Sequence, residues 1–318
     1  MSSGNFGRTS KGISTISRSI REMHTADSFH EVGFTRMANM KERTIYLGDT
    51  SVPGPQTTFT QIGELIEGFL SSFFGWFGEL GIFCVRLVRA ALTRPFEGRE
   101  LIRQLDEVGS KSLLLVSLAG AAIGVVLSLE TSASLMRFGA KSMLPSVIMI
   151  SIVRETGPII TGLIVCGRVG AGIGAELGSM KVTEQIDAME ASAVNPYRFL
   201  VATRVLACTL MLPLLTLAAD FWGIIMGWVA NTLSEPISLR LFLDTGLNSA
   251  TFNDFLPPTI KTAVFGLIIG VIACFQGMRA TGGTAGVGRA ATTSVVLSSL
   301  FIILADVLLV RLILMFFP

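Results

Sequence analysis

Two adjacent charged residues, Arg154 and Glu155, interrupt a long apolar stretch and are soon followed by Pro158. A charge inside a membrane costs about 2.5–3.5 kcal/mol on insertion scales, so such side chains usually face a cavity or an internal partner. Adjacent residues on a helix do not face each other, so we do not expect these two charges to neutralise one another directly. Pro158 lacks a backbone donor and favours a kink. One interpretation is therefore a polar spot in a substrate cavity.

The same two residues also have a purely structural interpretation. An internal ion pair with Asp220 or Asp306, which lie in later apolar segments, would explain them equally well. So would a position nearer the membrane interface than the limits of the apolar stretch suggest. The residues alone leave the functional and the structural interpretation open.

A second candidate is the short acidic segment between two later apolar stretches. We expect Thr183 to cap the N-terminus of a helix that ends before Asn195 and Pro196. Its apolar side chains recur at four-three-four spacing: Val182, Ile186, Met189 and Ala193. The polar candidates are Thr183, Glu184, Gln185, Asp187 and Glu190. Such a helix suits docking, with its apolar side on the protein and its acidic side toward a partner. An ordinary solvated loop helix explains the composition equally well.

A glycine-rich run from Gly282 to Gly288 resembles a phosphate-binding loop at first sight. It lacks the Lys-Ser/Thr ending of a P-loop and follows no soluble strand, so we favour an inside loop between two membrane spans. The sequence has no P-loop elsewhere. If ATP drives this protein, another subunit must bind it, so the chain itself is expected to be neither an enzyme nor a cofactor-binding protein.

The cysteines and histidines give no catalytic or metal site. His24 and His30 both lie in the polar N-terminal segment, away from the apolar part. The cysteines are far apart in apolar stretches, and we expect them to be buried hydrophobic residues: Cys84, Cys166, Cys208 and Cys274. Neither a zinc site, a redox pair nor a hydrolase is indicated.

The composition explains why charged positions stand out. Half of the 318 residues are hydrophobic, only 15% are charged, and the mean hydropathy is +0.64. These values exclude a disordered protein, a disulfide scaffold and most soluble enzymes of this size. A net charge of +2 is too small to suggest a nucleic-acid partner. We therefore predict an all-α integral membrane protein.

The elements that must position the candidates follow from the hydrophobic pattern. Residues 1–57 lack an apolar run and are expected to form a flexible cytoplasmic extension, and 58–318 the membrane domain. Residues 59–92 predict an amphipathic helix in the membrane interface, with an apolar face formed by Ile62, Ile66, Phe69, Phe73, Phe77 and Leu80. Five membrane spans are predicted at residues 112–129, 144–167, 205–233, 262–278 and 290–317.

The distribution of Lys and Arg predicts the orientation. Most of them lie on the side of the amino terminus: Arg86, Arg89, Arg94, Arg99, Arg103, Lys111, Arg168, Lys181, Arg198, Arg204, Arg279 and Arg289. The opposite loops hold only Arg137, Lys141, Arg240 and Lys261. We therefore place the amino terminus in the cytoplasm and the carboxyl terminus outside.

Small residues at helix-packing spacing predict a tightly packed bundle. The pairs are Gly120/Gly124, Gly170/Gly174/Gly178, Gly223/Gly227 and Gly266/Gly270. Such spacing allows helices to approach closely in lipid. The same pairs also suggest a seam between two copies in a homodimer.

Three ordered motifs resemble the MlaE (YrbE-type) permeases, the membrane subunits of phospholipid ABC transporters linked to MCE proteins. The motifs are Arg154–Pro158, then Gly167–Gly170 with Ala175–Met180, then Val182–Met189, and Asn195-Pro196 and Leu212–Thr216 continue the match. The resemblance covers about residues 60–318. It implies a homodimer, each copy having an N-terminal membrane-embedded helix and five spans in the bacterial inner membrane, with a periplasmic carboxyl terminus.

The resemblance also implies partners and roles. Two cytoplasmic ABC ATPases, which bind ATP and Mg²⁺, are expected to dock on the helix at 183–194. A small STAS-type subunit and a periplasmic MCE ring would complete the assembly. Phospholipid would pass between the membrane cavity and the MCE tunnel. As our own hypothesis, Arg154 and Glu155 border that cavity near the headgroup level. Two alternatives stay open: an ion- or proton-coupled secondary transporter, and a membrane anchor for the MCE assembly that transports nothing.

Overall fold

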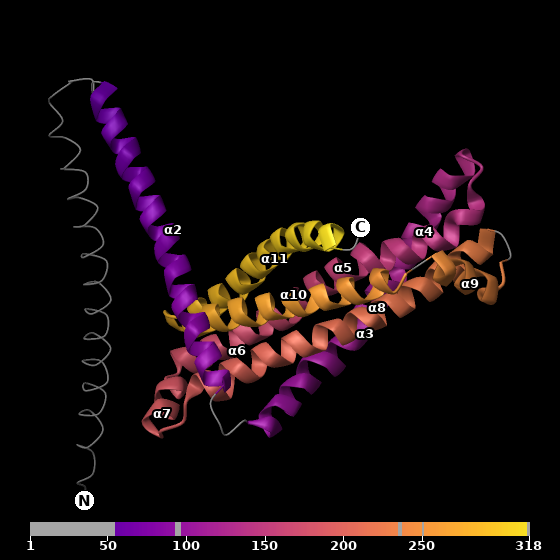
Figure 1. Ribbon diagram of the computed structural model, residues 1–318. Coiled ribbons are helices and arrows are strands. Elements are labelled where there is room, and N and C mark those ends of the chain that lie inside the picture. Colours follow the sequence, from indigo (N-terminus) through magenta and orange to yellow (C-terminus); the bar gives the residue numbers. More distant parts are fainter. Residues whose placement is uncertain (1–54, 93–96, 235–236, 250, 317–318) are drawn as a thin grey trace, which may run out of the picture. The chain divides into compact units, whose positions relative to one another are not determined.

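The computed structural model describes residues 55–92, 97–234, 237–249 and 251–316, and every regular element in these ranges is a helix (Figure 1). The chain divides after Phe74 into two compact units. The description below concerns the second, residues 75–318. Of the predicted cytoplasmic extension, residues 1–54 lie outside the described residues, and residues 55–57 already belong to the first helix.

The helices follow the hydrophobic pattern, with wider bounds than the sequence predicts. The first elements are α2 (Pro55–Leu92) and α3 (Gly98–Arg137). One long composite helix follows, built from η1 (Lys141–Met143), α4 (Leu144–Ser151), η2 (Ile152–Thr156), α5 (Gly157–Val165), η3 (Cys166–Gly170) and α6 (Ala171–Val182). The remaining elements are α7 (Gln185–Ala191), η4 (Tyr197–Ala202), α8 (Thr203–Ser234), α9 (Leu239–Ser249), α10 (Phe252–Met278) and α11 (Gly283–Phe316).

The five predicted spans are confirmed. Within the described residues, five helical stretches are long and apolar enough to cross a membrane: Gly98–Arg137, Lys141–Val182, Tyr197–Leu233, Asp254–Met278 and Gly283–Met315. The helix predicted over 59–92 is also present and begins earlier, at Pro55. The chain is therefore an all-α integral membrane protein.

Glycines bring the spans into contact within one chain. A Cβ atom on Gly124 would overlap the backbone of Gly223, where α3 meets α8. A Cβ on Gly266 would likewise overlap the backbone of α8 at Cys208. The prediction of a tightly packed bundle is confirmed. The seam between two copies that the same pairs suggest stays a prediction.

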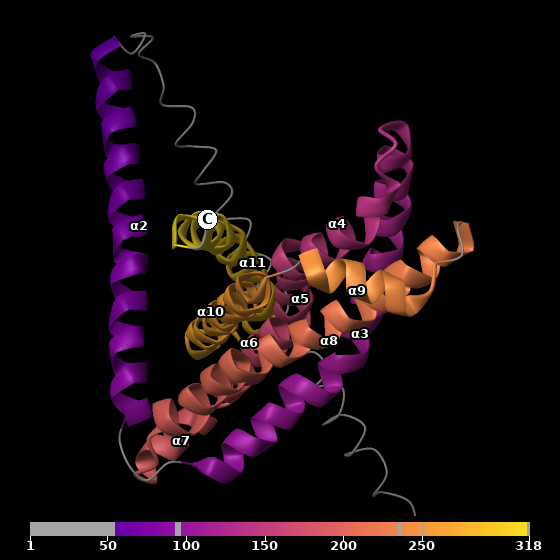
Figure 2. The same ribbon diagram turned by 45° about the vertical axis from the view of Figure 1, so that its right-hand side comes forward.

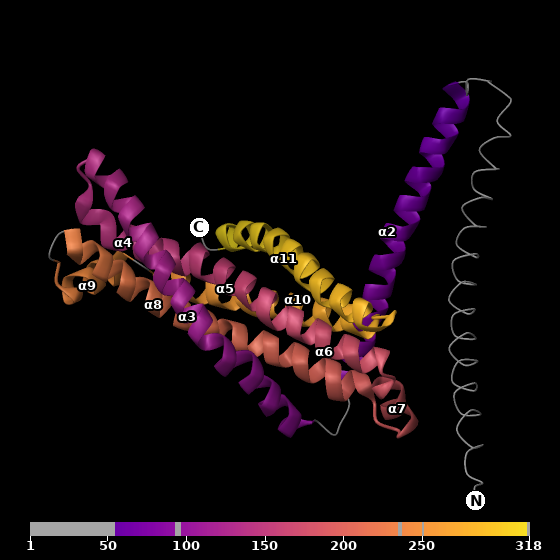
Figure 3. The same cartoon turned by 180° about the vertical axis from the view of Figure 1, so that it is seen from behind.

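The unit of residues 75–318 has two distinct ends. Figures 1 and 3 show α7 at one end and α4 and α9 at the other, and Figure 2 shows α4 and α9 side by side. Phe242 of α9 is fully buried, and the Ser249 hydroxyl lies 2.7 Å from that of Ser146. The sequence predicts a loop for this segment, which includes Arg240. It is instead an amphipathic helix packed on α4.

Candidate functional site

Arg154 forms an ion pair with Asp254 across 100 positions of sequence. The Nε of Arg154 donates to Oδ1 of Asp254 at 2.6 Å. The other carboxylate oxygen accepts the backbone N–H of Thr251 at 2.6 Å, because Asp254 lies in the first turn of α10. Asp254 is buried, whereas 46% of the Arg154 side chain is exposed. The anchored carboxylate thus fixes a guanidinium that remains half exposed.

Glu155, the next residue, pairs in a different direction. Its Oε2 accepts from Nζ of Lys261 on α10 at 3.0 Å. The same ammonium group lies 3.0 Å from Oδ1 of Asp306 on α11. Lys261 is 2% exposed and Glu155 47% exposed. A buried cation between two carboxylates therefore joins η2, α10 and α11.

The two candidate residues thus behave partly as predicted. Arg154 and Glu155 do not pair with each other, and each finds an internal partner. The predicted partners were wrong, because neither Asp220 nor Asp306 pairs directly with Arg154 or Glu155. Asp306 instead contacts the ammonium group of Lys261, which also contacts Glu155.

The local backbone explains why neighbouring side chains diverge. Pro158 has no N–H to donate to the carbonyl of Arg154, so the regular α-helical bond cannot form there. The N–H of Gly157 instead reaches the carbonyl of Ile152, which makes η2 a single π turn. The disturbance predicted at Pro158 therefore takes the form of a widened turn that begins just before it.

Asp220 approaches the same turn from α8. A Cβ atom on Gly157 would overlap the Asp220 carboxylate, so only glycine leaves room for it. Asp220 is 5% exposed, and its Oδ1 has no hydrogen-bond partner among the described residues. The π turn is therefore bordered by a buried acidic group as well as by the two ion pairs.

Sequence reasoning missed Asp254 and Lys261. It assigned Lys261 to an outside loop because an apolar run begins directly after it. Since α10 starts nine residues earlier, at Phe252, Lys261 lies inside the helix and is buried. The spacing of Thr251 and Asp254 matches a capping box, which is the signal that marks the true start of this helix.

The charged network lies far from α7. Lys261 is 17 residues before Met278, the last residue of α10. At 1.5 Å per residue this corresponds to about 26 Å along the helix. The C-terminal end of α10 lies at the α7 end of the bundle, so the charged network lies in the opposite half (Figure 1).

The acidic helix exists as α7, but it begins one residue later than predicted. Thr183 is not its N-cap: it ends α6, and its hydroxyl donates to the carbonyl of Ser179 at 2.8 Å. Glu184 takes the capping position with a positive φ of 59°. The helix ends at Ala191, so the predicted Ala193, with a φ of 60°, lies outside it.

The two faces of α7 are arranged as predicted. Ile186 is 1% exposed and Met189 packs against the same core. Glu184, Gln185, Asp187 and Glu190 are exposed. Of the acidic residues, Asp187 is held by Lys181 at 2.7 Å. Glu184 and Glu190 form no ion pair with any residue that the structure describes. A cavity of about 420 Å³ lies beside α7, with Ile186, Glu190 and Arg86 in its lining.

The glycine-rich segment is helical rather than a loop. Helix α11 begins at Gly283, so residues 283–288 form its first turns. The connection from α10 is only the short stretch 279–282. The prediction of an inside loop over Gly282–Gly288 was therefore wrong for all but its first residue.

Comparison with known proteins identifies relatives of the spanning region. The profile of the family described as Permease MlaE matches residues 101–312. A probable ABC transporter permease protein of Rickettsia felis is 34% identical over 235 residues, which are 74% of this chain and 91% of the relative. A probable ABC transporter permease protein of Synechocystis is 35% identical over 208 residues, or 65% and 79% of the two chains. The Arabidopsis thaliana protein TRIGALACTOSYLDIACYLGLYCEROL 1, chloroplastic, is 32% identical over 235 residues, or 74% and 67%.

Proposed function

The chain belongs to the MlaE permease family, and we propose that it forms the lipid pathway of an ABC transporter whose ATP is hydrolysed by a separate subunit. The sequence has no P-loop of its own. The ATPase, with its ATP and Mg²⁺, is therefore a partner.

The proposed substrate is a phospholipid. The Arabidopsis relative bears the name of trigalactosyldiacylglycerol, which is a glycerolipid, and this supports a glycerolipid substrate. Exposing two acyl chains to water costs about 0.8 kcal/mol per CH₂, so on the order of 20 kcal/mol for one phospholipid. A pathway between membranes must therefore enclose the chains in apolar surface and offer polar groups to the headgroup.

Arg154 and Glu155 supply these polar groups in our proposal. Each is half exposed, and each is fixed from behind by a buried residue of opposite charge. A cation and an anion are thus presented by the same turn of helix, in different directions. A phospholipid headgroup that carries a phosphate and an ammonium group offers the complementary pair of charges.

In this proposal the ATPase docks on α7, and the arrangement of the two faces of this helix is the observation that best supports the proposed function. The helix is fixed to the bundle by Ile186, and its carboxylates face outward. A short helix held in this way transmits a push from a bound subunit to α6, to which it is joined directly. Basic residues on the partner are expected to meet Glu184 and Glu190.

The remaining parts of the assembly follow from the family. We propose a homodimer with two ATPases, a STAS-type subunit and an MCE protein, in the bacterial inner membrane. The α7 end faces the cytoplasm, together with the amino terminus, and the carboxyl terminus faces the periplasm. The charged network then lies in the periplasmic half, where lipid is exchanged with the MCE protein.

Lipid transfer from proteoliposomes tests this function. The full chain is purified with its bound subunits, and release of a fluorescent phospholipid to the MCE protein is followed with ATP or a non-hydrolysable analogue. We expect transfer only when ATP is hydrolysed. Transfer that ignores ATP but stops when the ion gradient is collapsed would contradict the proposal and favour a secondary transporter.

A further inference from the structure

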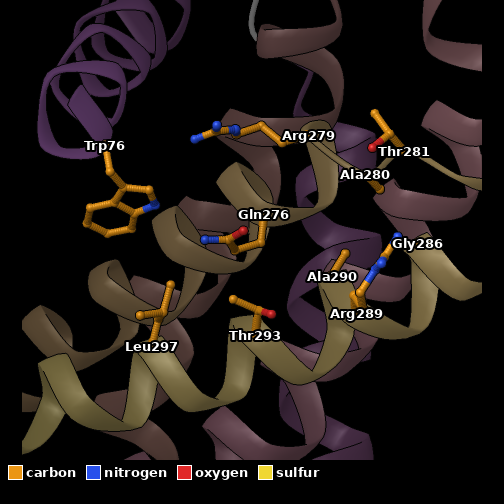
Figure 4. A pocket seen from close by; sticks show the side chains of 10 residues that line it. All are labelled: Trp76, Gln276, Arg279, Ala280, Thr281, Gly286, Arg289, Ala290, Thr293 and Leu297. Carbon is orange, nitrogen blue, oxygen red and sulfur yellow. The ribbon is translucent and has the colours of Figure 1, made fainter. Parts of the chain in front are cut away.

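A second polar pocket lies at the α7 end, away from the charged network. It has a volume of about 370 Å³ and lies between α2, α10 and α11 of the 75–318 unit. Figure 4 shows Trp76 and Leu297 on one side and Arg289 on the other, with Gln276 and Thr293 between them. Gln276 is 15 residues from Lys261, or about 22 Å along α10. The pocket is therefore distinct from the region proposed to meet the transported lipid.

Positive charge dominates this pocket. Arg279 lies in its wall, where Nη1 pairs with Glu79 at 2.5 Å and the guanidinium lies 4.9 Å from the ring centre of Phe275. Arg289, in contrast, is exposed and forms no ion pair with any described residue. The Glu79 carboxylate thus pairs with Arg279 alone, and Arg289 has no counter-charge among the described residues. An anionic ligand would balance the remaining charge, and arginine is suited to phosphate.

The connection between α10 and α11 leaves room for Arg289. Gly282 has a φ of +86°, a conformation that favours glycine. A Cβ atom there would lie 3.3 Å from the Nη2 atom of Arg289, closer than ordinary contact. The guanidinium therefore lies directly against the backbone of the turn, beside the first turns of α11.

The opposite side of the pocket is apolar and continues onto an exposed helix face. Trp76 stacks on Phe301 with ring centres 6.1 Å apart and contacts Phe275 edge-on at 5.8 Å. Next to Leu297 and beyond it, α11 carries exposed apolar side chains: Val296, Leu300, Ile303 and Leu304. An indole beside a basic group is typical of the membrane–water interface. A free phosphate would contact only the arginines, whereas a phospholipid would contact both the arginines and the apolar side of the pocket.

We propose that this pocket binds the phosphate-bearing headgroup of an anionic phospholipid in the leaflet on the α7 side, with its acyl chains along α11. Basic pockets between membrane helices bind such headgroups. The bound lipid is a resident ligand that contacts α2, α10 and α11 together, and it is not the transported molecule. The site goes beyond the proposed transport function and does not depend on the direction of transport.

Native mass spectrometry of the purified full chain tests this site. The probes are phosphatidylglycerol and phosphatidylcholine with identical acyl chains. We expect phosphatidylglycerol to bind several-fold more tightly. Arg289→Gln is the main variant, because Arg289 has no described ion pair whose loss would disturb the fold. It should weaken phosphatidylglycerol binding several-fold, since one charge-assisted contact is lost, and weaken phosphatidylcholine binding less, because the choline ammonium already neutralises that phosphate.

A control variant and a competition experiment complete the test. Arg240→Gln removes an exposed arginine of α9 at the other end and should leave both lipids unaffected. Millimolar inorganic phosphate should not displace phosphatidylglycerol, because it cannot use the apolar side. Wild-type affinity for phosphatidylglycerol in both Arg289→Gln and Arg279→Gln/Arg289→Gln would overturn the proposal. Displacement by inorganic phosphate that depends on Arg289 would also overturn it, since the ligand would then be free phosphate.

Discussion

The Nζ of Lys261 lies 3.0 Å from the Oε2 of Glu155, although 106 positions separate the two residues. Because the same ammonium also lies 3.0 Å from Asp306, it connects the π turn of the second span with the last two spans. A buried ion pair does not always add stability over an apolar contact, but removing one partner leaves an uncompensated charge. The connection is therefore most sensitive to loss of its central cation.

Lys261→Met should destabilise the protein strongly. It leaves Glu155 and Asp306 without their common cation, and breaking a buried pair typically costs about 3–5 kcal/mol. The melting temperature of the detergent-purified protein measures this effect. Lys261→Met combined with Glu155→Gln and Asp306→Asn should recover most of the loss. If the single variant is as stable as the native protein, the network does not hold the helices together.

Glu155→Gln should impair lipid transfer more than it impairs the fold. Lys261 keeps its contact with Asp306 in this variant, so its charge remains paired. The carboxylate offered to the headgroup is lost, and we expect a several-fold lower rate of transfer and of lipid-stimulated ATP hydrolysis. Arg154→Gln should act in the same direction. Arg240→Gln is the control for the removal of an exposed charge.

Unchanged transfer in both variants, with the fold intact, would remove Arg154 and Glu155 from the lipid pathway. The ion pairs would then have only a structural role, which is the interpretation that the sequence left open.

Reversal of charge on α7 should weaken binding of the ATPase. Glu184→Arg/Glu190→Arg alters the two exposed carboxylates that have no described ion pair and leaves the contact between Asp187 and Lys181 intact. We expect at least tenfold less ATPase to co-purify, because close charge pairs across an interface determine specificity and rate of association. Asp244→Arg is the control, because it reverses an exposed carboxylate of α9 at the other end of the bundle. Equal recovery of ATPase in all three proteins would mean that it docks elsewhere.

Gly124→Ala should destabilise the contact between α3 and α8. The added methyl group meets the backbone of Gly223, which has no flexible side chain to move aside, and overpacking of this kind costs about 1–3 kcal/mol. Gly172→Ala is the control, because a Cβ there has no neighbour within 4 Å. Thermal unfolding should separate the two variants. Equal stability would show that α3 and α8 are not packed as closely as described.

The sequence predicted the elements well because their signals are local. Long apolar stretches predicted all five spans, and the spacing of Ile186 and Met189 predicted which side of the acidic helix is buried. The helix of residues 55–92 also followed from its periodicity. In each case the pattern lies within one segment and needs no knowledge of its neighbours.

The partners of the charged residues could not be predicted in the same way. Arg154 meets Asp254, and Glu155 meets Lys261, only because α10 packs against the π turn. Hydropathy places a lysine at the edge of an apolar run, so the sequence predicts a loop position for Lys261. The positive φ of Glu184 is a further example, since a non-glycine residue in that conformation carries no composition signal.

Identification of what co-purifies with the full chain from its native membrane is the most direct test of the central claim. Gentle extraction, followed by mass spectrometry of bound proteins and lipids, should find an ABC ATPase in stoichiometric amount and phospholipid retained by the complex. A protein recovered without any nucleotide-hydrolysing subunit and without bound phospholipid would contradict the account.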